Sequence, residues 1–377
     1  MCGIVGAVAQ RDVTPILIEG LRRLEYRGYD SAGVALLTHD GQLARRRAQG
    51  KVQQLADAIA AAPVQGHLGI AHTRWATHGV PSERNAHPHF SEDQIALVHN
   101  GIIENHEVLR SELRARGYVF TSETDTEVVA HLLNDAFKQT GDLLKAMQAA
   151  IQKLHGAYAI VALDRRDPKR LICARAGCPV VLGEGSGEFY VASDVQALLP
   201  QTRSFRFLEE GDIADISLDG LRVYDRDGRV VERALKQSEL SADAVERGEY
   251  AHYMLKEIYE QPRALGDTLS ERIAGNRVLE AALGPKAQAM LPLVKGVHIV
   301  ACGTSFHAGL IARYYIEQGA RLPCTVEVAS EFRYRRPVVP AGTLFIAISQ
   351  SGETADTLAA LRYAKELGYV ATAAICN

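Results

Sequence analysis

Met1-Cys2-Gly3-Ile4-Val5-Gly6 opens the chain and decides how its first half is interpreted. An initiator methionine is normally removed when the next side chain is small, so we expect the mature chain to begin at Cys2. A terminal cysteine carries both a thiol and a free α-amine. Because that amine titrates near about pH 8, it can act as the base that activates the thiol. The alternative is a small buried cysteine at the start of an edge strand, and position alone does not decide between the two.

The composition limits the classes of protein and of partner. A chain of 377 residues predicts two or three domains. Its 42 Lys and Arg against 45 Asp and Glu give a net charge of −3, which offers no overall attraction for nucleic acid or anionic membranes. The six cysteines form no CxxC pair, and the sequence contains neither a signal segment nor an apolar run of about 20 residues. We therefore expect a cytoplasmic protein with reduced thiols and with no nucleic-acid or membrane partner.

Residues 1–235 have the pattern of a sheet-rich domain with hairpin connections. Asp40-Gly41, Asp219-Gly220 and Asp227-Gly228 predict tight turns, because Asp-Gly tolerates the positive φ angles that hairpins require. The apolar strand candidates are Ile4 to Val8, Gly33 to Leu37, Leu68 to His72, Ile95 to His99, Ala157 to Leu163, Leu171 to Ala174, Phe189 to Ala192 and Ile213 to Ile216.

Two helix starts can be recognised in this half. Thr14 precedes Pro15, which suits the first helical position, and Thr124 with Glu127 matches the capping-box pattern. A buried helical stripe is predicted at Leu17, Leu21 and Leu24.

The remainder of the chain changes character twice. Residues 236–295 read as a linker, at 237–243, and a helical lead-in in which Pro262 ends or kinks a helix. From 296 to 377, strands at 297–301, 325–328, 344–348 and 370–376 alternate with helices at 304–316 and 354–366. This alternation predicts a doubly wound parallel sheet. Because such a sheet needs helices over both faces, we expect it to be incomplete and the chain to be a piece of a longer protein.

An acylating cysteine needs donors for an oxyanion and fixed charges to orient its substrate. Arg74 could clamp a carboxylate, or it could be a surface arginine at a strand end. Asn100 and the Gly101 N–H could form an oxyanion hole, or the pair could be an ordinary Asn-Gly turn. Asp125 could hold an ammonium group, or it could only complement a helix dipole. The histidines 72, 78, 87, 89 and 99 lack a recognisable ligand spacing, so we expect no metal.

Two hydroxyl-rich loops each lie between a predicted strand and a helix in the last segment. They are Cys302-Gly303-Thr304-Ser305 and Ser349-Gln350-Ser351-Gly352-Glu353-Thr354. Helix N-termini with nearby hydroxyl groups can cradle a phosphate, and two such loops on one sheet converge on one crevice. The alternative for either loop is simple N-capping of the helix.

Five ordered motifs in the first half together resemble the glutamine:fructose-6-phosphate aminotransferase family. They are Cys2 to Gly6, Leu24 to Gly33, His72 to Gly79, His99 to Asn105 and Ser122 to Glu127. The resemblance implies an α+β, N-terminal-nucleophile αββα sandwich, a class II glutamine amidotransferase domain, over residues 1–235. Cys2 would attack the glutamine side-chain amide, with Asn100 and Gly101 stabilising the oxyanion. The other implied roles are glutamine binding by Arg74, Thr77, His78 and Asp125, gating by Trp75 and ordering of the site by Arg27.

The last segment resembles the first sugar isomerase domain of the same family, through Ala329 to Arg335 and Ser349 to Thr354. The resemblance implies an incomplete α/β domain over residues 296–377, no cofactor, and a homodimer for the full-length protein. The phosphosugar contacts that it implies are Thr304, Ser305, Ser349, Gln350, Ser351 and Thr354.

The expected function is hydrolysis of L-glutamine, which supplies ammonia to fructose 6-phosphate and yields glucosamine 6-phosphate and glutamate. The isomerase machinery of the family belongs to a second lobe, so we expect this chain to act as a glutaminase only. One alternative is an amidotransferase that acts on phosphoribosyl pyrophosphate or on aspartate, although the matching binding motifs are missing. Another is a phosphosugar-binding regulatory module with an inactive glutaminase domain.

Overall fold

The computed structural model describes residues 2–25, 29–75, 78–238, 250, 252–270, 272–275, 277–284, 286–350 and 354–376. The chain forms two compact units, Met1–Pro285 and Lys286–Asn377. The division at residues 235 and 295 that the motifs predict is finer than this and stays a prediction.

The first unit contains two antiparallel sheets. In spatial order, one consists of β15 (Leu235–Gln237), β11 (Ser204–Phe207), β9 (Val181–Glu184), β10 (Phe189–Ala192), β1 (Gly3–Val8), β4 (Leu68–Arg74), β2 (Ser31–Leu37) and β3 (Leu43–Gln49). The other consists of β14 (Val230–Val231), β13 (Gly220–Tyr224), β12 (Ile213–Ser217), β8 (Asp167–Ala176), β7 (Gly156–Asp164), β6 (Ile95–Ile103) and β5 (His89–Ser91). All eight predicted strands are present.

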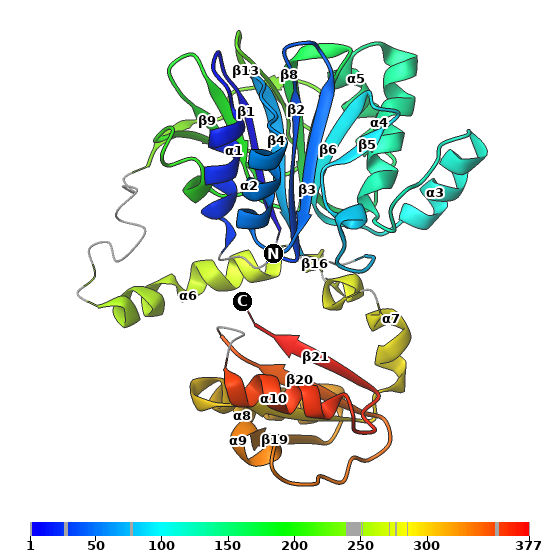
Figure 1. The fold of residues 1–377 in the computed structure, drawn as a ribbon, viewed down its shortest axis with the longest axis vertical. Helices are drawn as coiled ribbons and strands as arrows, with labels where there is room; N and C mark the ends of the chain where they lie inside the picture. The colour runs from blue at the N-terminus through cyan, green and yellow to red at the C-terminus, as the bar shows by residue number, and fades with distance from the viewer. Residues whose placement is uncertain are drawn as a thin grey trace. The chain divides into compact units, whose positions relative to one another are not determined.

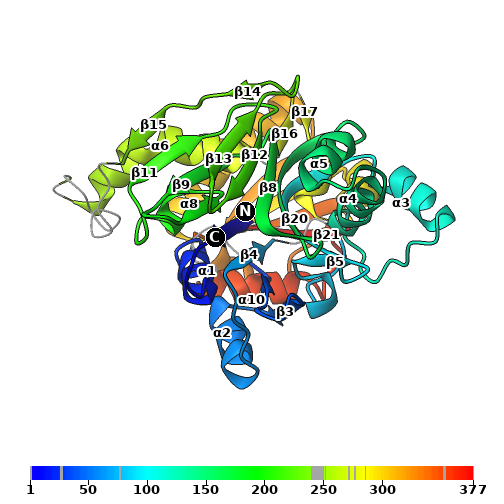
Figure 2. The same ribbon diagram turned by 90° about the horizontal axis from the view of Figure 1, so that it is seen from above.

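Helices cover the outer face of each sheet, which gives four layers (Figures 1 and 2). Helices α1 (Thr14–Arg22) and α2 (Val52–Ala61) pack on the sheet that contains β1. Helices α4 (Thr126–Thr140) and α5 (Leu143–Ile151) pack on the sheet that contains β6, together with part of α3 (His106–Ala115). Between the sheets, alternate residues of β4 and β6 form a third apolar layer. The predicted αββα sandwich is therefore confirmed.

The local signals of this unit are confirmed. Helix α1 begins at Thr14 with Pro15 in its first turn, and the stripe of Leu17, Leu21 and Leu24 is fully buried. The Asp-Gly pairs lie in the hairpins β2–β3, β12–β13 and β13–β14, and Gly41 has a φ of 73°. The positive φ explains why glycine suits this turn.

The capping prediction needs a correction. Helix α4 begins at Thr126, two residues later than predicted, with Asp125 as its N-cap. The Thr124 hydroxyl accepts a hydrogen bond from the Glu127 N–H at 3.3 Å, as a capping box requires. The Glu127 carboxylate, however, reaches back past Thr124 and accepts hydrogen bonds from the N–H groups of Thr121 and Ser122. This extra reach lengthens the segment before the helix and places Asp125 at its N-terminus.

The middle segment is less helical than predicted. It contains α6 (Tyr253–Ser270), the hairpin β16 (Ile273–Ala274) with β17 (Arg277–Val278), and α7 (Ala287–Met290). Helix α6 continues through Pro262, so the proline does not end it. The carbonyl that loses its helical partner belongs to Ile258, which is 53% exposed and therefore open to water. Most of the predicted linker lies outside the described residues.

The second unit has a four-stranded parallel sheet in the order β19 (Cys324–Val328), β18 (Gly296–Ala301), β20 (Thr343–Ile348) and β21 (Ala371–Ile375). Helix α8 (Gly303–Tyr315) packs on one face, and α9 (Ala329–Phe332) and α10 (Ala355–Ala364) pack on the other. The predicted doubly wound sheet is confirmed, and it ends at β21, whose Ile375 is 60% exposed. Among the described residues, the short helical turns are Glu83–Asn85, Val195–Ala197, Glu280–Leu283, Leu291–Leu293 and Ile316–Ala320.

A search of the described residues for a helix long and apolar enough to cross a bilayer finds none.

Candidate active site

Cys2 immediately precedes β1, in the middle of the first sheet. Because β1 pairs with both β10 and β4, it is a central strand and not an edge strand. Its register places Gly3 opposite Thr73 and so brings Cys2 to the end of β4. The Cys2 side chain is 9% exposed, and its Sγ accepts a hydrogen bond from the Trp75 N–H at 3.2 Å. The thiol thus has a fixed position beside the end of β4. It belongs to the residue that would also carry the free amine.

The Asn100-Gly101 pair lies inside β6 and does not form a turn. Asn100 is fully buried, and its Nδ2 donates a hydrogen bond to the Cys2 carbonyl at 3.2 Å. Strands from opposite sheets therefore bring together two residues that are 98 positions apart. An amide and a glycine N–H beside a thiol suit an oxyanion hole.

Arg74 is the last residue of β4, but its side chain is only 3% exposed, so it is not a surface arginine. Its Nη1 lies 3.5 Å from Asp30 Oδ1, and its Nη2 donates to the His78 and Gly79 carbonyls. Among the described residues, Nη1 makes no hydrogen bond of acceptable geometry. A buried guanidinium held in this way can still bind a carboxylate.

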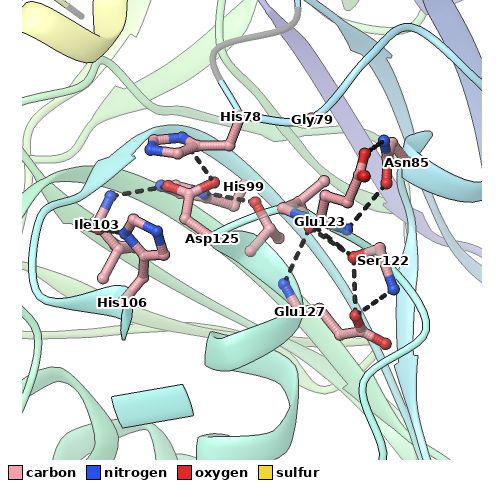
Figure 3. Close-up of polar contacts among 12 residues, drawn as sticks. His78, Gly79, Asn85, His99, Ile103, His106, Ser122, Glu123, Asp125 and Glu127 are labelled. Atoms are coloured by element: carbon pink, nitrogen blue, oxygen red, sulfur yellow. Dashed lines mark hydrogen bonds and ion pairs between the residues drawn. The ribbon is translucent and has the colours of Figure 1, made fainter. Parts of the chain in front are cut away.

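Asp125 is 3% exposed and lies at the N-terminus of α4. Figure 3 shows its carboxylate between the His78 ring and the Ile103 backbone. Oδ2 accepts the Ile103 N–H at 2.8 Å, and Oδ1 lies 3.6 Å from His78 Nδ1. Burial alone would raise the pKa of this carboxyl, but His78, His99 and the Ile103 hydrogen bond outweigh it and lower the pKa. Asp125 is therefore charged at neutral pH and can hold a cation.

These groups line one small pocket. Its lining residues are Cys2, Arg74, Trp75, His78, His87, His99, Gly101, Thr124, Asp125 and Thr126. The pocket thus combines a thiol, a buried cation and a buried anion. Of the other predicted glutamine-site residues, Asn100 is absent from this lining but donates a hydrogen bond to the Cys2 carbonyl. Arg27 and Thr77 lie outside the described residues. No group of three His, Cys, Asp or Glu side chains suited to a metal occurs among the described residues.

Sequence reasoning gave no role to three groups that shape this pocket. Asp30 fixes Arg74, the Ile103 N–H fixes Asp125, and His72 contacts Asn100. His72 belongs to the same alternate row of β4 as Ile70 and Arg74, so the period-2 pattern could have placed it between the sheets.

The two hydroxyl-rich loops follow neighbouring strands of the second unit. Ala301 pairs with Ile348, so the segments that begin at Cys302 and Ser349 leave the sheet side by side. Ser349 Oγ lies 3.3 Å from Thr354 Oγ1. Neither N-cap residue, Cys302 or Thr354, makes a side-chain capping bond. Thr304, Ser305 and Gln350 are at least partly exposed there, and Ser351 lies outside the described residues.

The two-sheet fold is that of the N-terminal nucleophile class, and comparison with known proteins points to glutamine amidotransferase domains. Residues 72–200 match the family model of the glutamine amidotransferase domain, and residues 294–377 match that of the SIS domain. Over all 377 residues the chain is similar to the glutamine–fructose-6-phosphate aminotransferases [isomerizing] of Pseudomonas syringae pv. tomato, at 58% identity, and Shewanella oneidensis, at 59%. The resemblance that the motifs predicted is therefore confirmed. The chain spans 62% of the length of each of these relatives.

A solved structure supports the fold alone. The Bacillus subtilis glutamine phosphoribosylpyrophosphate amidotransferase, complexed with ADP and GMP, matches 92% of this chain and 75% of its own length. The TM-score is 0.53 and the sequence identity 19%.

Substitution of Gly101 by alanine should damage the pocket through its backbone. Gly101 has a φ of 117°, and a Cβ atom there would lie 2.0 Å from the Ala157 carbonyl oxygen. We expect the backbone to shift, with a loss of about 1–3 kcal/mol in the free energy of unfolding. The matched control is Gly117→Ala, where φ is 91° but a Cβ meets nothing within 4 Å. Chemical denaturation measures the change in the free energy of unfolding. Glutamine hydrolysis should show a loss of activity for Gly101→Ala only.

The thiols should differ sharply in reactivity. Burial raises the pKa of the Cys173 thiol far above its ordinary value, and the side chain is fully buried. Cys376 is exposed. We expect iodoacetamide to alkylate Cys376 and Cys2 in the native protein and Cys173 only after denaturation, as mapped by peptide mass spectrometry. Rapid native labelling of Cys173 would contradict the buried position of β8.

Proposed function

We propose that the first unit hydrolyses L-glutamine with Cys2 as the nucleophile. The observation that carries this proposal is that a cation, an anion and a thiol line one pocket. Arg74 suits the α-carboxylate, Asp125 suits the α-ammonium, and Cys2 with Asn100 suits the amide at the far end of the side chain. Glutamine carries all three groups. His78 and Trp75 would complete the glutamine site, as would Thr77 and Arg27 by the family resemblance.

The reaction follows from these positions. The α-amine of Cys2 takes the thiol proton, and the thiolate attacks the amide carbon of glutamine. Asn100 Nδ2 and the Gly101 N–H would stabilise the resulting oxyanion. The protonated α-amine then gives its proton to the departing nitrogen, so that ammonia leaves and a thioester remains. Water hydrolyses the thioester, which releases glutamate and restores the thiol.

We further propose that the whole protein delivers this ammonia to fructose 6-phosphate and forms glucosamine 6-phosphate. The support is the similarity to aminotransferases that carry this name and the paired hydroxyl loops of the SIS domain. Thr304, Ser305, Ser349, Gln350, Ser351 and Thr354 would hold the sugar phosphate, since hydroxyl groups near helix N-termini suit a phosphate. A homodimer and a cytoplasmic location belong to the same proposal.

Two assays test the proposal. Intact mass establishes whether Met1 has been removed, and the coupled formation of glutamate from L-glutamine then measures the glutaminase. We expect glutamate release by protein that begins at Cys2 and little by protein that retains Met1, because only the former has the free amine. Equal rates for the two forms would exclude the terminal amine as the base.

The regulatory alternative is separated by ligand response. A phosphosugar-binding module with an inactive first unit would bind fructose 6-phosphate, measured by calorimetry, and release no glutamate at any stage of processing. We expect glutamate release whether or not the sugar phosphate is present.

A further inference from the structure

A chain of buried imidazole groups lies behind Asn100. His72 Nε2 lies 3.0 Å from Asn100 Oδ1 and 3.0 Å from the His99 carbonyl oxygen. His87 Nδ1 lies 2.9 Å from His72 Nδ1 and 3.1 Å from its Nε2. His72 is fully buried and His87 is 4% exposed. The chain therefore runs from His87 through His72 and Asn100 to the Cys2 carbonyl.

The contacts assign a proton to His72 and an orientation to the Asn100 amide. The His99 carbonyl can only accept, so His72 Nε2 must carry a hydrogen. That same hydrogen faces the Asn100 side chain, which must therefore present its oxygen to His72 and its NH2 group to Cys2. The Cys2 carbonyl, which also can only accept, requires the same orientation of the amide. His72 Nδ1 then carries no hydrogen in the neutral ring, and His87 Nδ1 lies almost equally far from both nitrogens of that ring, at 2.9 and 3.1 Å.

The charge state agrees with this assignment. Burial lowers the pKa of His72 to about 3 and also lowers the pKa of His87 well below its ordinary value. Both rings are neutral at physiological pH, so each offers one donor and one acceptor.

The contact of His72 with Asn100 links the two sheets. His72 lies on β4 of the sheet that contains Cys2, whereas Asn100 lies on β6 of the opposite sheet. Their neighbours in the same alternate rows, such as Ile70 and Val98, are apolar and can fix no amide orientation. The polar contact between the sheets thus occurs at the level of the nucleophile.

We propose that His72 is a positioning residue that locks the Asn100 amide with its NH2 group toward Cys2. The proposal rests on the proposed glutaminase function. Without the lock, the Asn100 amide could rotate and present an oxygen to the developing oxyanion. Repulsion between the Asn100 oxygen and the oxyanion would then destabilise the transition state. The binding of glutamine to Arg74 and Asp125 would not change.

The first experiment compares His72→Leu with His72→Gln in glutamine hydrolysis. We expect His72→Leu to lower kcat about 10²-fold, as loss of one oxyanion donor does, with KM changed less than about threefold. The Gln amide can donate to the same two acceptors. We therefore expect the kcat of His72→Gln to be at least about tenfold higher than that of His72→Leu. In an Asn100→Ala background, His72→Leu should cost no further activity, because the two residues act as one unit.

The matched control is His131→Leu, which removes another buried histidine. His131 lies on α4, contacts Ser91 of β5 and does not line the pocket. It should lower thermal stability without a selective fall in kcat. A merely structural role for His72 would make His72→Leu behave like this control, or would make its loss additive with Asn100→Ala. Either result would overturn the proposal.

A second measurement does not depend on activity. Long-range 1H–15N correlation spectra of the histidine side chains report which ring nitrogen carries the hydrogen, and His72→Gln assigns the signal. We expect the Nε2–H form for His72. An Nδ1–H form for His72 would refute the lock even in an active enzyme. An Nε2–H form in a protein without glutaminase activity would instead count against the proposed function.

Discussion

Cys2→Ala should abolish glutamate release, with a loss of about 10⁴-fold or more, because Cys2 carries the only thiol among the described residues that line the pocket. The substitution removes one sulfur atom whose contacts are with the Trp75 backbone, so the fold should survive. Circular dichroism and thermal unfolding should match those of the parent protein. The measurement is coupled glutamate formation at saturating L-glutamine.

The matched control for this prediction is Cys376→Ala. Cys376 is exposed and lies in the second unit, so its loss should leave glutaminase activity unchanged. Residual activity of Cys2→Ala at the parent level would move the nucleophile elsewhere and remove the central step of the proposed mechanism. If neither protein releases glutamate while both bind fructose 6-phosphate, the regulatory alternative gains support.

Asp125→Asn should lower kcat/KM for L-glutamine about 10²-fold, which corresponds to about 2.7 kcal/mol. Asparagine keeps an oxygen that can accept the Ile103 N–H, so the position of the side chain should be retained. What is lost is the negative charge, which the lowered pKa of Asp125 maintains in the parent protein. The buried substrate ammonium would then have no counter-charge.

A substrate analogue separates this electrostatic loss from a distorted site. 4-Carbamoylbutanoate has the carboxylate and the amide of glutamine but no α-ammonium. The parent protein should hydrolyse it with a reduced kcat/KM, and Asp125→Asn should cause little further reduction. A second large loss with the analogue would show that Asp125 supports the structure of the pocket and does not bind the ammonium group.

Local sequence signals identified the long apolar strands and several helices, and some of their failures have specific causes. Strands such as β1 and β7 are continuous apolar runs, and the alternation of strands and helices after residue 296 reproduces the parallel sheet. Strand β3 was not recognised, because three consecutive arginines occupy its middle and interrupt the apolar pattern that is typical of a strand. The start of α4 was placed at Thr124, because the capping pattern does not reveal that Glu127 reaches back to Thr121 and Ser122.

The alternatives left open for the site residues were decided by burial and register. Arg74 ends a strand, but it is enclosed by Asp30 and the carbonyls of the following loop. Asn100 and Gly101 resemble a turn in sequence, yet they continue β6 and pair with β7. These facts depend on partners that are distant along the chain, and local propensities do not contain them.

The sequence by itself determined the elements, the two fold types and the residue types of the pocket, because periodicity, turn residues and ordered motifs are local properties of the chain. Only the tertiary structure decided that the thiol of Cys2, the amide of Asn100 and the charges of Arg74 and Asp125 meet, and that His72 stands behind them. The physical reason is the packing of two sheets. Burial between the sheets leaves each polar group only the partners that the facing strand supplies, and those partners fix its protons, its charge and its direction.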